Sequence, residues 1–73
     1  MVEMFENLCE AYRKECRSAG LQPKQVSTAD VDVFTGDYFL EDDDGNVVCC
    51  LSKDGFVVSI FHYTEVGNDR QKN

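Results

Sequence analysis

The side chains best suited to chemistry are four cysteines and one histidine: Cys9, Cys16, Cys49, Cys50 and His62. On a helix, Cys9 and Cys16 would lie about 10.5 Å apart along the axis, which is too far for a disulfide. Neighbouring residues of a strand point to opposite faces, so Cys49 and Cys50 should not meet. We therefore expect free thiols that act as small apolar core residues. The alternative is a bond across the core from Cys49 to Cys9 or Cys16.

No group of residues has the spacing of a metal or catalytic centre. A zinc site needs closely spaced ligands such as C-x2-C, and His62 beside Cys49 has no third ligand or orienting acid. A calcium loop with Gly45 at its sixth position would put Leu40 and Leu51 where carboxylates are required. No phosphate-cradling loop is present, and a chain of 73 residues leaves little volume for a ligand cleft. We expect a non-enzymatic protein without metal or cofactor.

The acidic residues are more informative. The formal net charge is −7, and residues 1–29 balance four acids with four bases. Residues 30–69 hold ten acids and one base, Lys53, for a net charge of −9. Such a field repels nucleic acid and anionic membranes and favours basic partners. A simpler interpretation is that the acids only keep a small protein soluble.

Length and composition predict one domain, residues 1–66, followed by a polar tail, residues 67–73. The apolar content of 42% is that of a globular chain. The start has no basic segment followed by an apolar run, and no apolar stretch is long enough to span a bilayer. These features predict a cytoplasmic protein that does not enter membranes.

Residues 2–19 have the periodicity of an amphipathic helix. At about 100° per residue, one stripe collects the apolar side chains Val2, Phe5, Leu8, Cys9, Tyr12, Cys16 and Ala19. Charged residues occupy the opposite side, acids first and bases last, as the helix dipole favours. Gly20 fits the position after a helix end, and Leu21 can contact Cys16 as the apolar cap. Pro23 then prevents the helix from resuming.

Residues 24–36 are ambiguous. Val31 and Val33 alternate with Asp30 and Asp32, which favours a strand. Ser27 followed by Asp30 could instead open a short helical turn. We favour an extended segment.

Two Asp-Gly pairs predict hairpins, because type I′ turns need positive φ at both central residues. Asp44-Gly45 and Asp54-Gly55 then separate three antiparallel strands near residues 37–42, 47–52 and 56–63. The predicted pairs are Tyr38 with Leu51, Leu40 with Cys49, Leu51 with Val58 and Cys49 with Ile60. The predicted fold is α+β: one N-terminal amphipathic helix on a meander of three or four antiparallel strands.

Strand alternation divides these side chains between two faces. The first face, on which the helix should pack, carries Tyr38, Leu40, Val47, Cys49, Leu51, Val58 and Ile60. The second face carries Phe39, Val48, Cys50, Val57, Phe61 and Tyr63, with Glu41, Ser52 and Ser59 among them. A half-solvated sheet is normally polar on its outer side. The apolar second face therefore predicts a cover: residues 24–34, a second copy or a partner.

The leading hypothesis for function is an acidic interaction protein that occupies a basic, nucleic-acid-binding site on a protein partner without contacting nucleic acid itself. Its predicted acidic tip consists of Glu41, Asp42, Asp43 and Asp44, with Asp30, Asp32, Asp37 and Asp54 nearby. Proteins that mimic DNA in this way, many from phages that disarm host defences, are small and acidic and contain both helix and sheet. The comparison is an analogy between classes of protein.

The alternative function is a homodimeric structural or regulatory module. Its contact would be the apolar second face, through Phe39, Val48, Val57, Phe61 and Tyr63. A third hypothesis is strand addition, in which a partner's extended peptide pairs with an open sheet edge.

Overall fold

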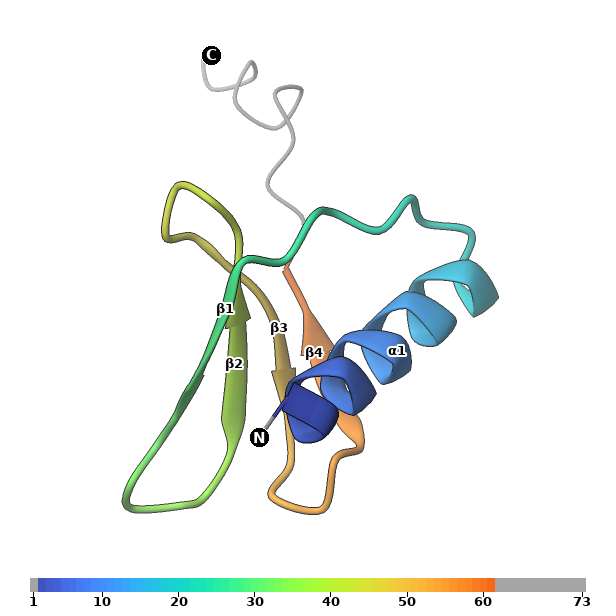
Figure 1. Ribbon diagram of the computed structural model, residues 1–73. Helices are drawn as coiled ribbons and strands as arrows, with labels where there is room; N and C mark the ends of the chain where they lie inside the picture. Colours follow the sequence, from blue (N-terminus) through green and yellow to red (C-terminus); the bar gives the residue numbers. More distant parts are fainter. Residues whose placement is uncertain (1, 62–73) are drawn as a thin grey trace, which may run out of the picture.

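One helix is followed by four strands (Figure 1). The computed structural model describes residues 2–61. The elements are α1 (Val2–Ser18), β1 (Thr28–Val31), β2 (Tyr38–Glu41), β3 (Val47–Leu51) and β4 (Val57–Ile60). The strands form one antiparallel sheet in the order β1-β2-β3-β4. The predicted α+β meander is confirmed, whereas the predictions for His62, Tyr63 and the polar tail lie outside the described residues.

The apolar stripe of α1 packs on the sheet as predicted. Leu8, Cys9, Tyr12 and Cys16 are buried, and the charged residues between them are exposed. Backbone hydrogen bonds close the helix end: the N–H of Leu21 donates to the carbonyl of Cys16 (2.8 Å), and the N–H of Gly20 donates to that of Arg17 (3.2 Å). This pair of bonds is the Schellman motif, which satisfies carbonyls that the helix end leaves without partners.

Residues 24–36 contribute an edge strand, as predicted, and the helical turn that Ser27 and Asp30 could have opened does not form. β1 pairs with β2 in the register Thr28–Glu41, Ala29–Leu40, Asp30–Phe39 and Val31–Tyr38. The segment therefore widens the sheet by one strand. It does not fold back over the second face.

Both Asp-Gly hairpin loops are one residue longer than predicted. After β2, the N–H of Asp42 donates to the carbonyl of Asn46 (3.0 Å), and the N–H of Gly45 donates to the carbonyl of Asp42 (3.0 Å). After β3, the same two bonds join Ser52 to Phe56 (2.7 Å) and Gly55 to Ser52 (2.8 Å). Each loop thus spans three residues and ends in a glycine with positive φ.

The reason is the cost of positive φ. A type I′ turn would require it at Asp44 and Asp54 as well, but among the described residues only glycines have it: φ is 85° at Gly45 and 91° at Gly55. For a residue with a side chain this conformation costs about 1–2 kcal/mol. A three-residue loop confines it to the glycine and places a bulge beside the turn.

The longer loops change which side chains face the helix. Three predicted pairs are confirmed: Tyr38 with Leu51, Leu40 with Cys49, and Cys49 with Ile60. The prediction for Leu51 is wrong: its partner is Val57, because the register shifts between Cys50 and Leu51, and a second shift lies between Leu40 and Glu41.

Each shift moves residues from one face to the other. Val48 is fully buried in the core and Val57 packs against that core, although both were assigned to the second face. Val58, assigned to the helix-packed face, is 62% exposed.

Tyr12 is at the centre of the core. It is fully buried, and its hydroxyl accepts a hydrogen bond from the backbone N–H of Lys24 (2.9 Å), which ties the loop after α1 to the helix. Burial raises the pKa of Tyr12 to about 12 and that of Cys49 to about 12. Folding therefore holds both groups in their neutral forms.

We predict that the protein loses stability in alkali. Because the folded pKa values of Tyr12 and Cys49 lie above their ordinary values of 10.0 and 9.0, the free energy of unfolding should be constant below about pH 9 and fall as pH rises towards 12. Urea titrations across this range measure the slope. Tyr12→Phe should reduce the slope and cost about 1 kcal/mol at neutral pH through the lost acceptor. If the slope in Tyr12→Phe equals that of the unmodified protein, the raised pKa of Tyr12 does not contribute to the loss of stability.

We also predict that Gly45→Ala and Gly55→Ala each lower the free energy of unfolding by about 1–2 kcal/mol. Apart from the two chain neighbours, no atom of the described residues lies within 4 Å of the Cβ that either change adds, so the cost is conformational and not steric. Asp54→Ala is the control, because Asp54 has negative φ and alanine can adopt the same conformation. The backbone N–H of Asp54, which donates to Ser52 Oγ (3.3 Å), is kept in this variant. Equal losses in the three variants, measured by urea unfolding, would contradict the loop geometry.

Candidate interaction surfaces

Five carboxylates gather where β1 begins and β2 ends. Glu41 is the last residue of β2, and Asp42, Asp43 and Asp44 follow it in the loop. Asp30 lies on β1 two register positions from Glu41, on the same face. The side chains of Asp30 and Glu41 are in hydrogen-bond contact on the face of the sheet away from α1. We call these five residues the acidic corner.

Two hydroxyl groups hold the acidic corner in place. Thr28 Oγ1 donates to Glu41 Oε1 (3.3 Å), and Ser27 Oγ donates to Asp43 Oδ1. Sequence reasoning missed both hydroxyls, because only the register of β1 on β2 places them opposite the acids. Asp42 has a local role: its Oδ1 accepts the backbone N–H groups of Asp44 (2.9 Å) and Asn46 (3.0 Å).

Within residues 2–61 no base forms an ion pair with the acidic corner, although Lys24 lines a surface hollow together with Asp42, Asp43 and Asp44. Among the described residues the ion pairs lie on α1, where Glu10 contacts Arg13 (3.0 Å) and Arg17 (3.7 Å). Residues 27–61 contain eight acids and one base, a net charge of −7. The pKa of Glu41 is raised, chiefly by its hydrogen bond with Asp30 and further by desolvation and by the Asp30 charge.

The acids expected at the tip do not form one cluster. Glu41 to Asp44 lie together, and Asp30, which was expected nearby, lies beside Glu41. Asp32 and Asp37 lie in the β1–β2 loop and Asp54 lies in the β3–β4 loop, at the opposite end of the sheet (Figure 1). Alternating strand direction explains the separation, since loops that follow odd and even strands of a meander leave the sheet at opposite ends.

The face of the sheet away from α1, here the outer face, is less apolar than predicted. Phe39, Cys50 and Ser59 lie on one rung of it. Val58 and Phe61 are exposed by 62% and 39%, and the N–H of Phe61 donates to the carbonyl of Val48 (2.8 Å). Val48 and Val57 have left this face for the core, and Tyr63 lies outside the described residues.

The four cysteines are free thiols, and Cys9, Cys16 and Cys49 are buried while Cys50 is half-buried. Burial is the main cause that raises the pKa of Cys9, Cys49 and Cys50, so the reactive thiolate is disfavoured. Within residues 2–61 no three His, Cys, Asp or Glu side chains are grouped as metal ligands would be. In the same range no helix has the length and apolarity to cross a membrane.

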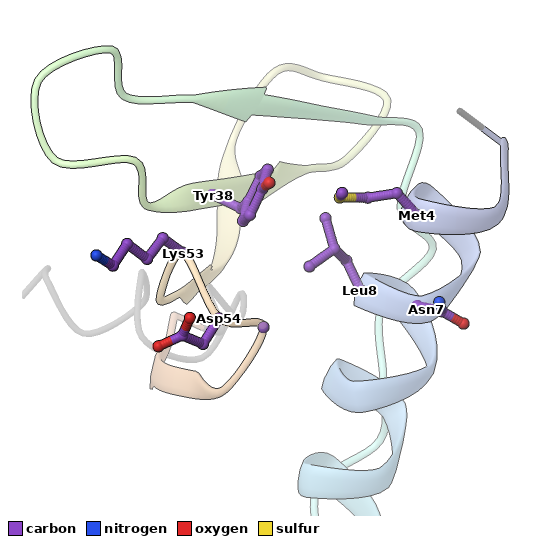
Figure 2. A pocket seen from close by; sticks show the side chains of 7 residues that line it. Met4, Asn7, Leu8, Tyr38, Lys53 and Asp54 are labelled. Atoms are coloured by element: carbon purple, nitrogen blue, oxygen red, sulfur yellow. The ribbon is translucent and has the colours of Figure 1, made fainter.

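A hollow of about 440 Å³ opens between the N-terminal half of α1 and one end of the sheet (Figure 2). Met4 and Leu8 of α1 and Tyr38 of β2 form its apolar part, and Lys53 and Asp54 lie at its end. This arrangement offers apolar contact area and no pair of groups placed for acid–base work.

No protein-family model, curated protein or solved structure matches the chain. The functional interpretation therefore depends on the geometry and charge of these surfaces.

We predict that Asp30→Asn lowers the pKa of Glu41 towards its ordinary value. The substitution removes the Asp30 carboxyl, whose hydrogen bond and negative charge both favour the protonated form of Glu41. Carboxyl carbon shifts followed by NMR against pH give the value directly. Asp37→Asn, at the far end of the sheet, is the control with the same loss of charge. An unchanged Glu41 pKa in Asp30→Asn would show that the two carboxyls do not interact.

Proposed function

We propose that this protein is a non-enzymatic binding protein whose acidic corner engages a basic surface of a protein partner. A basic site that normally binds nucleic acid is the target that the arrangement fits best, with the carboxylates in the place of phosphates. Binding there would inhibit the partner by competition, as phage DNA mimics inhibit their targets.

The observation that carries the proposal is that the carboxylates of the acidic corner form no ion pair within residues 2–61. Adjacent carboxylates repel one another, and a protein that needs acids only for solubility gains nothing by holding Asp30 against Glu41. Hydroxyls of Ser27 and Thr28 orient Asp43 and Glu41, and among the described residues no base forms an ion pair with either carboxylate, although Lys24 lies near Asp43. Fixed, unpaired negative charge is the feature that attracts a basic partner and accelerates association.

The homodimer through the outer face is the weaker candidate. Val48 and Val57, two of its five predicted contact residues, face the core. Asp30 and Glu41 border what is left of the outer face, and in a symmetric contact each copy would bring these charges towards the other.

The test uses a basic partner captured from lysate on the immobilised protein at low salt. We predict that Glu41→Gln/Asp43→Asn/Asp44→Asn slows association with that partner about tenfold or more and flattens the dependence of affinity on salt. Asp42 is left unchanged because it caps the loop. Stopped-flow or surface plasmon resonance at several salt concentrations measures both quantities, and competition with duplex DNA tests whether the occupied site binds nucleic acid.

The control variant Glu6→Gln/Glu15→Gln/Asp54→Asn has the same net charge, with its neutralised acids away from the acidic corner. It should keep most of the association rate and salt dependence. If the two variants behave alike, only overall charge matters, and the proposed role of the acidic corner is wrong.

A further inference from the structure

The loop between β1 and β2, residues 32–37, holds the most exposed large apolar side chains of the described residues. Phe34 is 94% exposed and Val33 is 82% exposed. Hydrogen bonds fix this turn: the N–H of Phe34 donates to Asp32 Oδ1 (2.8 Å), and the N–H of Gly36 donates to the carbonyl of Asp32 (2.7 Å). An aromatic side chain held outward by a fixed turn is suited to enter an apolar hollow, because little conformational entropy is lost on binding.

The strand that leads into this loop separates apolar side chains from charge. Val31 pairs with Tyr38 and shares its helix-facing side, yet it is 52% exposed. Asp30 and Asp32 flank Val31 in the sequence and therefore lie towards the outer face. Neighbouring strands lie about 4.8 Å apart and a helix with its side chains is about 10 Å wide, so α1 cannot cover all four strands. An uncharged, incompletely covered surface therefore extends from Tyr38 to the edge of the sheet.

The hollow of about 440 Å³ opens on the same side of the sheet (Figure 2). Tyr38, Met4 and Leu8 form its apolar part, and Met4 is 47% exposed there. Lys53 and Asp54 lie at its end, and both side chains extend away from Met4 and Leu8. The space between α1 and Tyr38 is therefore uncharged. Its volume is within the range of small-molecule pockets, which begin at about 300 Å³, and leaves room for an aromatic side chain.

We propose that two copies of this chain form a two-fold symmetric dimer in which Phe34 of each copy enters the hollow of the other. The chain carries both halves of the contact, a fixed and exposed aromatic side chain and an open apolar hollow, so no other molecule has to supply a matching surface. A two-fold contact uses the same patch on both copies and closes with two subunits. The inference does not depend on the proposed function, and it uses the side of the sheet opposite the outer face.

The distribution of charge permits this contact although each copy has a net charge of −7. The helix-facing sides meet, so Asp30 and Glu41 remain on the outer surfaces of the dimer. Lys53, the one base among residues 27–61, lies at the end of the hollow, and Asp32 lies beside Phe34. Insertion therefore brings the base of one copy towards an acid of the other. The repulsion that remains is long-range, so salt should screen it and strengthen the dimer.

Sedimentation equilibrium of the full chain over a range of concentrations measures dimerisation. We expect a dimer that dissociates on dilution, because the interface is small. Phe34→Ser and Met4→Glu should each weaken dimerisation at least about tenfold. Val58→Glu adds the same charge as Met4→Glu but on β4, at the other edge of the sheet, and should dimerise like the unmodified protein. The fold should persist in these variants, since Phe34 is exposed and an acid in the first turns of α1 suits the helix dipole.

A mixture of the two variants distinguishes insertion from a general loss of structure. Phe34→Ser keeps the hollow and lacks the aromatic side chain, whereas Met4→Glu keeps the aromatic side chain and has an altered hollow. Unlabelled Met4→Glu, added to isotope-labelled Phe34→Ser, should therefore restore one of the two insertions. We expect it to shift the NMR signals of Leu8 and Tyr38 in the labelled variant, and unlabelled Phe34→Ser, added in the same way, not to shift them.

Several results would overturn the inference. They are a monomer at every concentration, a dimer that Phe34→Ser leaves intact, equal dissociation by Val58→Glu and Met4→Glu, and a mixture in which the Leu8 and Tyr38 signals do not move. Nuclear Overhauser contacts between Met4 and residues 62–73 in the Phe34→Ser monomer would show that the chain's own end fills the hollow. None of these results bears on the acidic corner, whose neutralised variant should still dimerise.

Discussion

The steric cost of positive φ is the constraint on which the rest of the structure depends. Glycine adopts this conformation more cheaply than aspartate, and each Asp-Gly loop has three residues and ends at Gly45 or Gly55. The bulges beside these loops turn Val48 and Val57 towards α1. A local backbone preference at two positions therefore decides the composition of the core and leaves the outer face less apolar.

The same loops organise the negative charge. The Asp42 carboxylate holds the β2–β3 turn, and the neighbouring acids are oriented by hydroxyls from the start of β1. The core supplies the rigidity for this arrangement, since buried Tyr12 accepts a hydrogen bond from the backbone of Lys24, shortly before β1. Residues 19–27 therefore contact both the core, where Lys24 is bonded to Tyr12, and the acidic corner, where Ser27 is bonded to Asp43.

The two sides of the sheet differ in charge. Asp30 and Glu41 of the acidic corner lie on the outer face, whereas the hollows beside α1 lie on the helix-facing side. The half of the sheet under α1 has its apolar rungs filled by Leu8, Tyr12 and Cys16. Negative charge is therefore offered on the outer face and at the β2–β3 loop.

The sequence by itself determined the element types, the antiparallel meander and the excess of acid in its second half. These follow from periodicity, helix-end chemistry and composition, which act over a few neighbouring residues. Tertiary structure alone decided which acids meet, because Asp30 reaches Glu41 only through the β1–β2 register, while Asp37 and Asp54 leave at the other end. It also decided the faces of Val57 and Val58, since a bulge between Cys50 and Leu51 shifts the pairing at the turn while Ile60 keeps its predicted partner.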